Sequence, residues 1–234
     1  PGSLRQAVSN ASDGDMIDFD PGTNAATLVL TDGEINLSKH VQVDGSSLTG
    51  GVTISGDQTS RIFSVSEGSA VQLDSLNMTA GNATKGGAVS NRGDLRIMNS
   101  TVHDNEGDNG AGIYNRSEAT LTLENTTVAR NVATEEGGGI QNDGTLALIH
   151  STVAGNEAGE NGGGISGGLQ HLENTIIADN SAGLSGPDLS LSGSPPDLAG
   201  VNLIDDLDAS GLTPGASLLV ATPRLAPLAD YGGG

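Results

Sequence analysis

Two short patterns recur along the middle of the chain with a shared period, and this regularity constrains the fold most. One is a glycine run followed by a β-branched residue, and the other is a Thr-Val or Ile-Ile pair that closes on Asn three residues later. Their apolar members are Val89, Ile113, Ile140 and Ile165 in the first, and Val102, Val128, Val153 and Ile177 in the second. Short stretches of alternating Leu and Ile lie between them. A period of about 25 residues shared by three patterns indicates a solenoid with one turn per repeat.

Each repeat fits three short strands better than it fits helices. The repeated glycines oppose helix, and the leucine-rich-repeat pattern is absent. Alternating apolar residues bounded by Gly, Asn and Asp predict strands that pair in parallel with their counterparts one turn on, about 4.8 Å away. The inward columns then stack. Asn recurs at the turns and predicts side-chain ladders, with His150 as a member of the second one: Asn105, Asn131, Asn156 and Asn180, then Asn99, Asn125, His150 and Asn174.

The composition agrees with a thin, repetitive core. Glycine supplies 36 of 234 residues and aromatics only 2%, but glycine does not recur at every third position as collagen requires. The net charge of −20 argues against a nucleic-acid partner and against an anionic membrane surface. Cysteine is absent, and no apolar run is long enough to span a bilayer, so we expect no membrane insertion by this segment.

The two ends of the chain differ from the middle. Residues 1–20 contain Leu4, Ala7 and Val8 at helical spacing, with Ser3 as N-cap, and predict a short helix that covers the first coil. Residues 21–184 are assigned to the β-helix coils. Residues 185–234 are rich in proline, lose the repeat and are expected to form an irregular cover on the last coil. Both ends look cut from a longer chain, so an export signal is expected outside this segment.

Several of these segments resemble a known family. Residues 2–8, Gly-Ser-Leu-Arg-Gln-Ala-Val, followed by Asp15-Met-Ile-Asp-Phe19, resemble the CSLREA segment of bacterial surface β-helix proteins, with Gly2 in place of Cys. The Gly-Gly-x-Ile and Thr-Val-x-x-Asn motifs resemble polymorphic outer-membrane and adhesin-type repeats. This resemblance implies an all-β, right-handed parallel β-helix of the pectin-lyase-like class, located at the cell surface or outside the cell.

The sequence favours a structural or adhesive role over catalysis. The rod would display loops for multivalent contacts with glycans, matrix or neighbouring copies, including filament-like self-assembly. The alternative is a carbohydrate-active lyase or hydrolase, but the only adjacent acid pairs are Glu135–Glu136 and Asp205–Asp206. Arg92 and Arg116 share a column whose next members are Asp143 and Gly168, so no basic groove is expected there. No cofactor is expected to be required.

One group of acidic residues is a candidate calcium site. The segment between the Asn column and the glycine run is acidic in three successive coils, at Glu106, Asp108, Glu135, Glu136, Glu157 and Glu160. Stacking would bring these carboxylates together along one edge, where calcium could neutralise them. A solvated acidic edge that opposes self-association is the alternative explanation.

Overall fold

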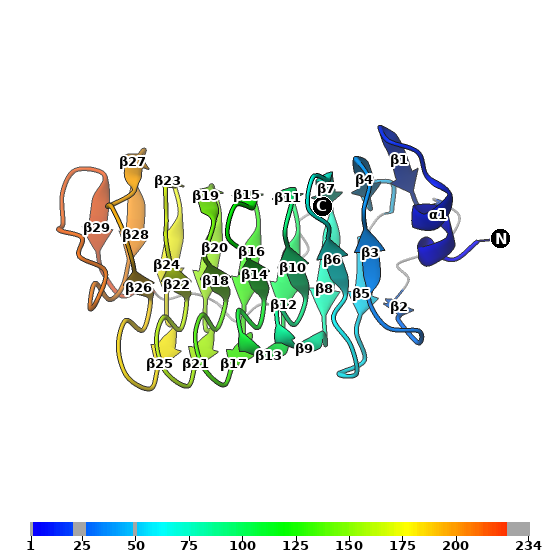
Figure 1. Cartoon of the computed structure of the whole chain (residues 1–234). Coiled ribbons are helices and arrows are strands. Elements are labelled where there is room, and N and C mark those ends of the chain that lie inside the picture. The colour runs from blue at the N-terminus through cyan, green and yellow to red at the C-terminus, as the bar shows by residue number, and fades with distance from the viewer. Residues whose placement is uncertain (1, 21–26, 49–50, 224–234) are drawn as a thin grey trace.

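The structure, a computed structural model, describes residues 2–20, 27–48 and 51–223. It is a right-handed parallel β-helix of about seven turns, with one short helix at its N-terminal end (Figure 1). This confirms the fold class expected from the repeat. Among the described residues, none belongs to a helix with the length and hydrophobicity needed to cross a bilayer.

Sheets A and B form two long faces of the solenoid, and the chain passes from A to B in each coil. Sheet A contains β1 (Asp15–Asp18), β4 (Val41–Asp44), β7 (Ala70–Asp74), β11 (Asp94–Met98), β15 (Thr120–Glu124), β19 (Thr145–Ile149), β23 (His171–Glu173) and β27 (Asp197–Ala199). Sheet B contains β2 (Thr27–Val29), β5 (Val52–Ser55), β8 (Leu76–Thr79), β12 (Thr101–His103), β16 (Thr127–Ala129), β20 (Thr152–Ala154), β24 (Ile176–Ala178), β28 (Asn202–Ile204) and β29 (Leu218–Val220).

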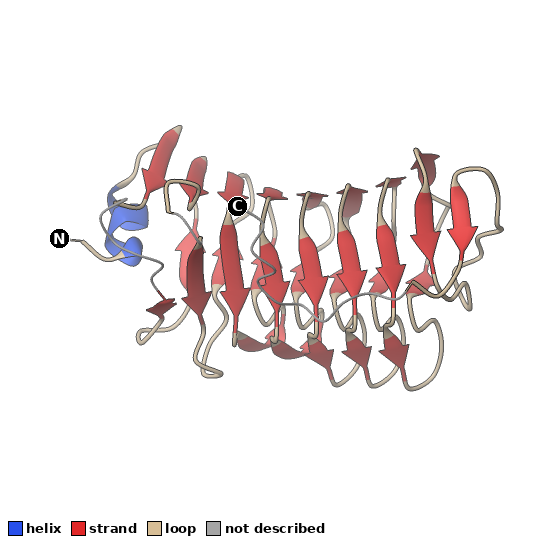
Figure 2. Cartoon of the chain, turned by 180° about the vertical axis from the view of Figure 1, so that it is seen from behind, coloured by secondary structure: helices blue, strands red, loops and turns tan. Residues whose placement is uncertain are grey.

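Sheets D and C complete each coil (Figure 2). Sheet D contains β9 (Asn82–Lys85), β13 (Glu106–Asn109), β17 (Val132–Ala133), β21 (Glu157–Ala158) and β25 (Ser181–Ala182). Sheet C contains β3 (Ile35–Leu37), β6 (Phe63–Val65), β10 (Val89–Asn91), β14 (Ile113–Asn115), β18 (Ile140–Asn142), β22 (Ile165–Gly167) and β26 (Leu189–Leu191). The sequence predicted three strands per coil. It missed sheet D because these short strands carry polar residues and little apolar alternation.

The core consists of the inward columns that the repeat predicted. Val102 is in register with Val128, which in turn is in register with Val153. Likewise Ile113 and Ile140 align with each other in sheet C. All five side chains are fully buried. Parallel pairing of like residues therefore fills a narrow interior almost without aromatic side chains.

The N-terminal helix forms as the capping signal predicted. Helix α1 (Leu4–Asn10) begins after Ser3, whose side chain accepts a hydrogen bond from the Gln6 backbone N–H at 3.2 Å. It buries Val8, with Leu4 and Ala7 packed against the core at the end of the solenoid. Strand β1, which falls within the segment assigned to the cap, already pairs with β4.

The coils extend past the boundary at residue 184. Strands β26, β27 and β28 continue sheets C, A and B, and β29 pairs with β28. The apolar alternation weakens here, and proline-containing turns separate the strands, so the sequence period is lost while the backbone pairing persists. The rest of the expected cover, residues 224–234, lies outside the described residues.

The main Asn ladder runs along the interior as predicted. The Asn105 amide donates to Asn131 Oδ1 at 2.8 Å, Asn131 donates to Asn156 at 2.9 Å, and Asn156 donates to Asn180 at 2.9 Å. Asp188 ends the row by accepting from Asn180 Nδ2 at 2.8 Å. Each rung therefore satisfies buried polar groups of its neighbour.

The second ladder is more exposed, and it includes His150. Asn125 donates to Asn99 Oδ1 at 3.2 Å, and His150 Nε2 lies 3.1 Å from Asn174 Nδ2. All four residues have positive φ, which Asn tolerates well. His150 is therefore a member of the turn column, as the sequence predicted.

Candidate functional site

The structure separates some of the six acidic residues proposed for calcium and stacks others. The Glu135 N–H donates to the Asp108 carbonyl at 2.9 Å and the Glu160 N–H to the Glu135 carbonyl at 2.8 Å, so these three follow one another on successive coils. In sheet D, Glu106 pairs with Val132 and Val132 pairs with Glu157, so an apolar residue separates these two carboxylates. Among the described residues, no three His, Cys, Asp or Glu side chains gather so as to hold a metal ion.

Three of the other acidic residues accept hydrogen bonds from neighbouring coils. Asp108 accepts from Thr134 Oγ1 at 2.9 Å, and Glu135 accepts from Asn109 Nδ2 at 2.6 Å. Glu136 accepts from Asn161 Nδ2 at 3.2 Å. Glu160 is exposed. Calcium binding at this edge stays a prediction, and a higher melting temperature in calcium than in chelator would support it.

A different surface combines charge with a hollow, on the outer face of sheet C. Side chains in this column alternate with the core residues and point away from the core. Most of them are nevertheless buried: Ser90, Tyr114, Gln141 and Ser166. Successive coils place Ser64, Ser90, Tyr114, Gln141 and Ser166 in register. The residue types in this column change from coil to coil, in contrast to the uniform columns of the core.

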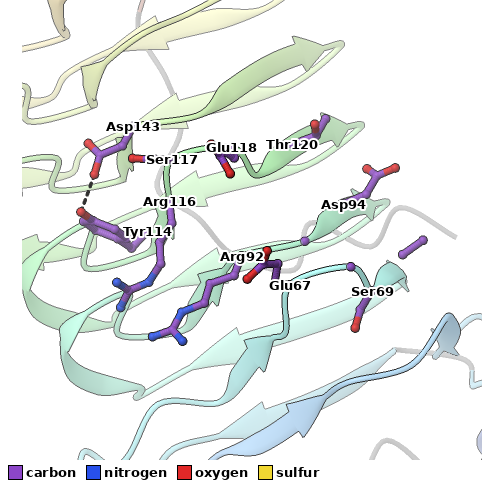
Figure 3. Close-up of a pocket in the computed structure, with 13 residues that line it drawn as sticks. Glu67, Ser69, Arg92, Asp94, Tyr114, Arg116, Ser117, Glu118, Thr120 and Asp143 are labelled. Atoms are coloured by element: carbon purple, nitrogen blue, oxygen red, sulfur yellow. Dashed lines mark hydrogen bonds between the residues drawn. The ribbon is translucent and has the colours of Figure 1, made fainter.

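Arg92 and Arg116 flank this column on the side of sheet A. They follow Asn91 and Asn115, which pair in register, so the two arginines lie on adjacent rungs. Figure 3 shows both side chains pointing in the same direction. Burial and the neighbouring Arg92 lower the pKa of Arg116 below its ordinary value. The local structure thus places two like charges side by side.

Neither arginine forms an ion pair with a carboxylate of the described residues. Among the described residues, Arg92 has no side-chain hydrogen bond or ion pair, and Arg116 Nε donates only to Ser90 Oγ at 3.3 Å. This is unusual in a chain with 29 acidic and nine basic residues. By contrast, Arg61 pairs with Glu34, Arg96 with Glu124 and Arg130 with Asp104.

Tyr114 holds the cationic groups in place. The Lys85 ammonium lies 4.8 Å from the ring centroid and the Arg116 guanidinium 5.2 Å from it, both within cation–π range. The phenol donates to Asp143 Oδ2 at 2.5 Å. Burial and this hydrogen bond raise the pKa of Tyr114 to about 12, so the hydroxyl stays protonated at neutral pH.

Arg61 extends the cationic surface by one coil. Its guanidinium donates to the carbonyl oxygens of Lys85 and Gly86 and to the Glu34 carboxylate. Four of the nine Lys and Arg residues therefore lie around one part of sheet C: Arg61, Lys85, Arg92 and Arg116.

A hollow of about 600 Å³ lies beside the arginines and continues into a second one of about 350 Å³. Arg92, Arg116 and Glu67 line both. Asp143 and Glu118 line the first, and Figure 3 shows how these side chains surround it. The site is elongated along the solenoid and has cations next to carboxylates and hydroxyls.

The sequence predicted that the column of Arg92 and Arg116 is not a basic groove, and the structure adds cations to it from outside the column. Arg92 and Arg116 share a column as expected, and Asp143 is the next member. Arg61 and Lys85 come from the opposite side of sheet C. Arg61 precedes Phe63 by two residues in the sequence, whereas Lys85 precedes Val89 by four, so the repeat does not align them. Only the coiled backbone brings these four cations together. The cation–π contacts of Tyr114 gave no sequence signal.

Comparisons with known proteins support the fold. No family model matches the chain, and no curated protein matches it. A solved structure described as pectate lyase Pel9A is similar to it, with a TM-score of 0.54 and 14% sequence identity. The match covers 87% of this chain and 56% of the pectate lyase chain. The protein therefore has a pectate-lyase-like parallel β-helix fold and spans little more than half the length of that structure.

Proposed function

We propose that this chain is an extracellular, non-enzymatic β-helix segment that binds anionic glycans on the outer face of sheet C. The observation that carries the proposal is the adjacent pair Arg92 and Arg116, neither of which forms an ion pair with a described carboxylate. Guanidinium groups bind carboxylates and sulfates in a planar, often bidentate geometry. An acidic polymer would satisfy both arginines.

The shape and the chemistry of the surface favour a glycan over a compact ion. The two hollows continue across several coils, and Asn36, Ser64 and Ser90 line the narrower one with hydrogen-bonding groups suited to sugar hydroxyls. The similar pectate lyase is named for pectate, an anionic polysaccharide. The net charge of −20 opposes nucleic acid, whose dense phosphates need a broadly basic surface.

Binding to labelled polygalacturonate, measured by fluorescence polarisation at low and moderate salt, tests the proposal. We expect Arg92→Gln to raise Kd by about tenfold, since a charged hydrogen bond contributes about 1.5–3 kcal/mol. Arg130→Gln is the matched control, because it removes the same charge on the side of sheet B. Equal effects of the two variants, or no binding by the wild-type protein to any acidic glycan, would refute this function.

A carbohydrate-active enzyme is the second candidate, and one observation favours it. The larger hollow brings the carboxylates of Glu67, Glu118 and Asp143 beside the two arginines. Lyases and hydrolases both need acid–base groups next to the bound sugar. Release of reducing ends or of unsaturated sugars from the bound polysaccharide would establish turnover, whereas binding without products supports the adhesive function.

A further inference from the structure

A third hollow, of about 390 Å³, lies on the outer face of sheet A. Ala70 and Asp94 line both this hollow and the larger hollow beside the arginines. Figure 3 shows Asp94 on the side of the larger hollow away from the two guanidinium groups. The surface described above therefore continues round the turn from sheet C to sheet A. There it includes one outward residue from each of four successive coils, all in register: Gln42, Gln72, Arg96 and Thr122.

The two glutamines in this hollow have free amides. Gln42 and Gln72 are paired in register on β4 and β7, and both side chains are half-buried. Stacked amides commonly hydrogen-bond from rung to rung, as the interior Asn ladder does. Here neither side chain forms a hydrogen bond with any described residue. Each amide therefore keeps two donor hydrogens and one acceptor oxygen for a ligand.

His40 adds a hydrogen-bond donor to the same hollow. Its Nδ1 accepts the Ala70 backbone N–H at 2.9 Å, so the neutral ring carries its hydrogen on Nε2. Sugar hydroxyls both donate and accept hydrogen bonds. The two amides and the imidazole together match that chemistry.

The charge of this hollow differs from that of the arginine surface. Asp15 and Asp94 line it, and the arginine that lines it, Arg96, pairs with Glu124. The two aspartates would repel a carboxylate of the ligand but not an uncharged sugar. Arg92 and Arg96 are four residues apart, which an extended chain spans in about 13 Å. A ligand of several sugars is needed to cover both surfaces.

We propose that Gln42, Gln72 and His40 form a subsite for an uncharged sugar of the polymer whose acidic sugar lies over Arg92 and Arg116. The bound chain passes round the turn between sheets C and A. The preferred ligand is then a polysaccharide that contains both acidic and neutral sugars, rather than a homopolymer of uronic acid. This inference rests on the proposed function.

Two oligomers in which galacturonate alternates with rhamnose, two and six sugars long, test the subsite by fluorescence polarisation. The disaccharide is too short to cover both surfaces, whereas the hexasaccharide reaches sheet A from the arginines. We expect Gln72→Leu to raise the Kd of the hexasaccharide about two- to tenfold, the range for one hydrogen bond, and to leave that of the disaccharide unchanged. The variant should fold, because the Gln72 side chain forms no hydrogen bond within the described residues.

Gln6→Leu is the matched control, because this exposed glutamine of α1 lines none of the three hollows. It should leave both affinities unchanged. If Gln72→Leu had no effect on the hexasaccharide, or weakened both oligomers equally, the subsite would be refuted while the proposed function stood. Failure of the wild-type protein to bind either oligomer or oligogalacturonate would refute the proposed function itself.

Asp94→Asn tests the preference for a neutral sugar independently. This substitution removes a repulsive carboxylate from the path of the ligand, so it should tighten binding of hexagalacturonate more than binding of the alternating hexasaccharide. Equal effects on the two hexasaccharides would contradict the assignment of a neutral sugar to sheet A.

Discussion

Two columns of polar side chains run along this solenoid. They differ in how many of their side chains find hydrogen-bond partners within the column. The interior ladder repeats Asn on every rung, and each amide hydrogen-bonds to the next. The outer column of sheet C changes from Ser90 to Tyr114 to Gln141 and leaves Gln141 Oε1 and the flanking Arg92 unpaired. A uniform column lets each side chain pair with the next, whereas a column that varies leaves polar groups without a partner.

Breaking the interior ladder should produce the largest effect on stability. Asn131→Ala removes the acceptor of the Asn105 backbone N–H and the donors to the Val102 carbonyl and to Asn156. Because these groups are buried, we expect unfolding to become easier by about 3 kcal/mol or more. Urea unfolding followed by circular dichroism measures this difference.

The more exposed ladder supplies the matched control. Asn125→Gly keeps the positive φ of this position and removes one exposed hydrogen bond to Asn99. We expect a loss below about 1 kcal/mol. If the two substitutions destabilised the protein equally, burial of the interior ladder would not be the source of its strength.

Crowding between coils should give the next largest loss of stability. A Cβ added at Gly138 would lie 2.4 Å from the Glu157 carbonyl oxygen and 2.5 Å from that of Gly163, although φ there is not positive. We expect Gly138→Ala to cost about 1–3 kcal/mol through overpacking. Gly215→Ala is the control, because an added Cβ there meets no atom within 4 Å. If Gly138→Ala left the stability unchanged, the coils would be able to separate locally.

The Asp that ends the interior ladder should make stability depend on pH. Burial raises the pKa of Asp188 above 3.8, although hydrogen bonds from Asn180 and from the Asp206 backbone N–H oppose the shift. The native state therefore binds this proton more tightly than the unfolded chain does. The resulting stabilisation is complete below pH 3.8 and is lost as pH rises through the raised pKa.

Comparing Asp188→Asn with the wild-type protein by urea unfolding at several pH values isolates this contribution. The variant lacks the titrating group, so it lacks the stabilisation that proton binding gives the wild-type protein at low pH. We expect its deficit to shrink as pH rises through the range where Asp188 ionises. A deficit independent of pH would contradict the raised pKa.

The smallest expected effect is on the pKa of Tyr114 in the outer column of sheet C, and spectroscopy measures it. Tyr114 and Tyr231 are the only tyrosines, so ultraviolet titration of a Tyr231→Phe background reports Tyr114 alone. We expect a pKa of about 12 for Tyr114, and Asp143→Asn should lower it by removing the negative charge beside the phenol. An ordinary pKa near 10 in the background protein would show that Tyr114 is not held as the structure indicates.

Much of the fold was predictable because equivalent residues of a repeating sequence lie next to one another on successive coils. Val102, Val128 and Val153 return at the same point of the period, so their stacking needed no knowledge of the coordinates. The Asn ladders followed for the same reason. Sheet D and the strands after residue 184 were missed because backbone pairing persists there without periodic apolar residues.

The sequence by itself determined the solenoid, its inward columns, the capping helix and the likeness of successive turns. The tertiary structure alone decided which non-repeated residues share a surface. It placed Val132 between Glu106 and Glu157, and it gathered four cations on one part of sheet C, namely Arg61, Lys85, Arg92 and Arg116. The physical reason is that turn lengths differ between coils. The repeat period therefore does not predict which residue lies beside one outside the repeat. The surroundings of such a residue depend on how each turn folds.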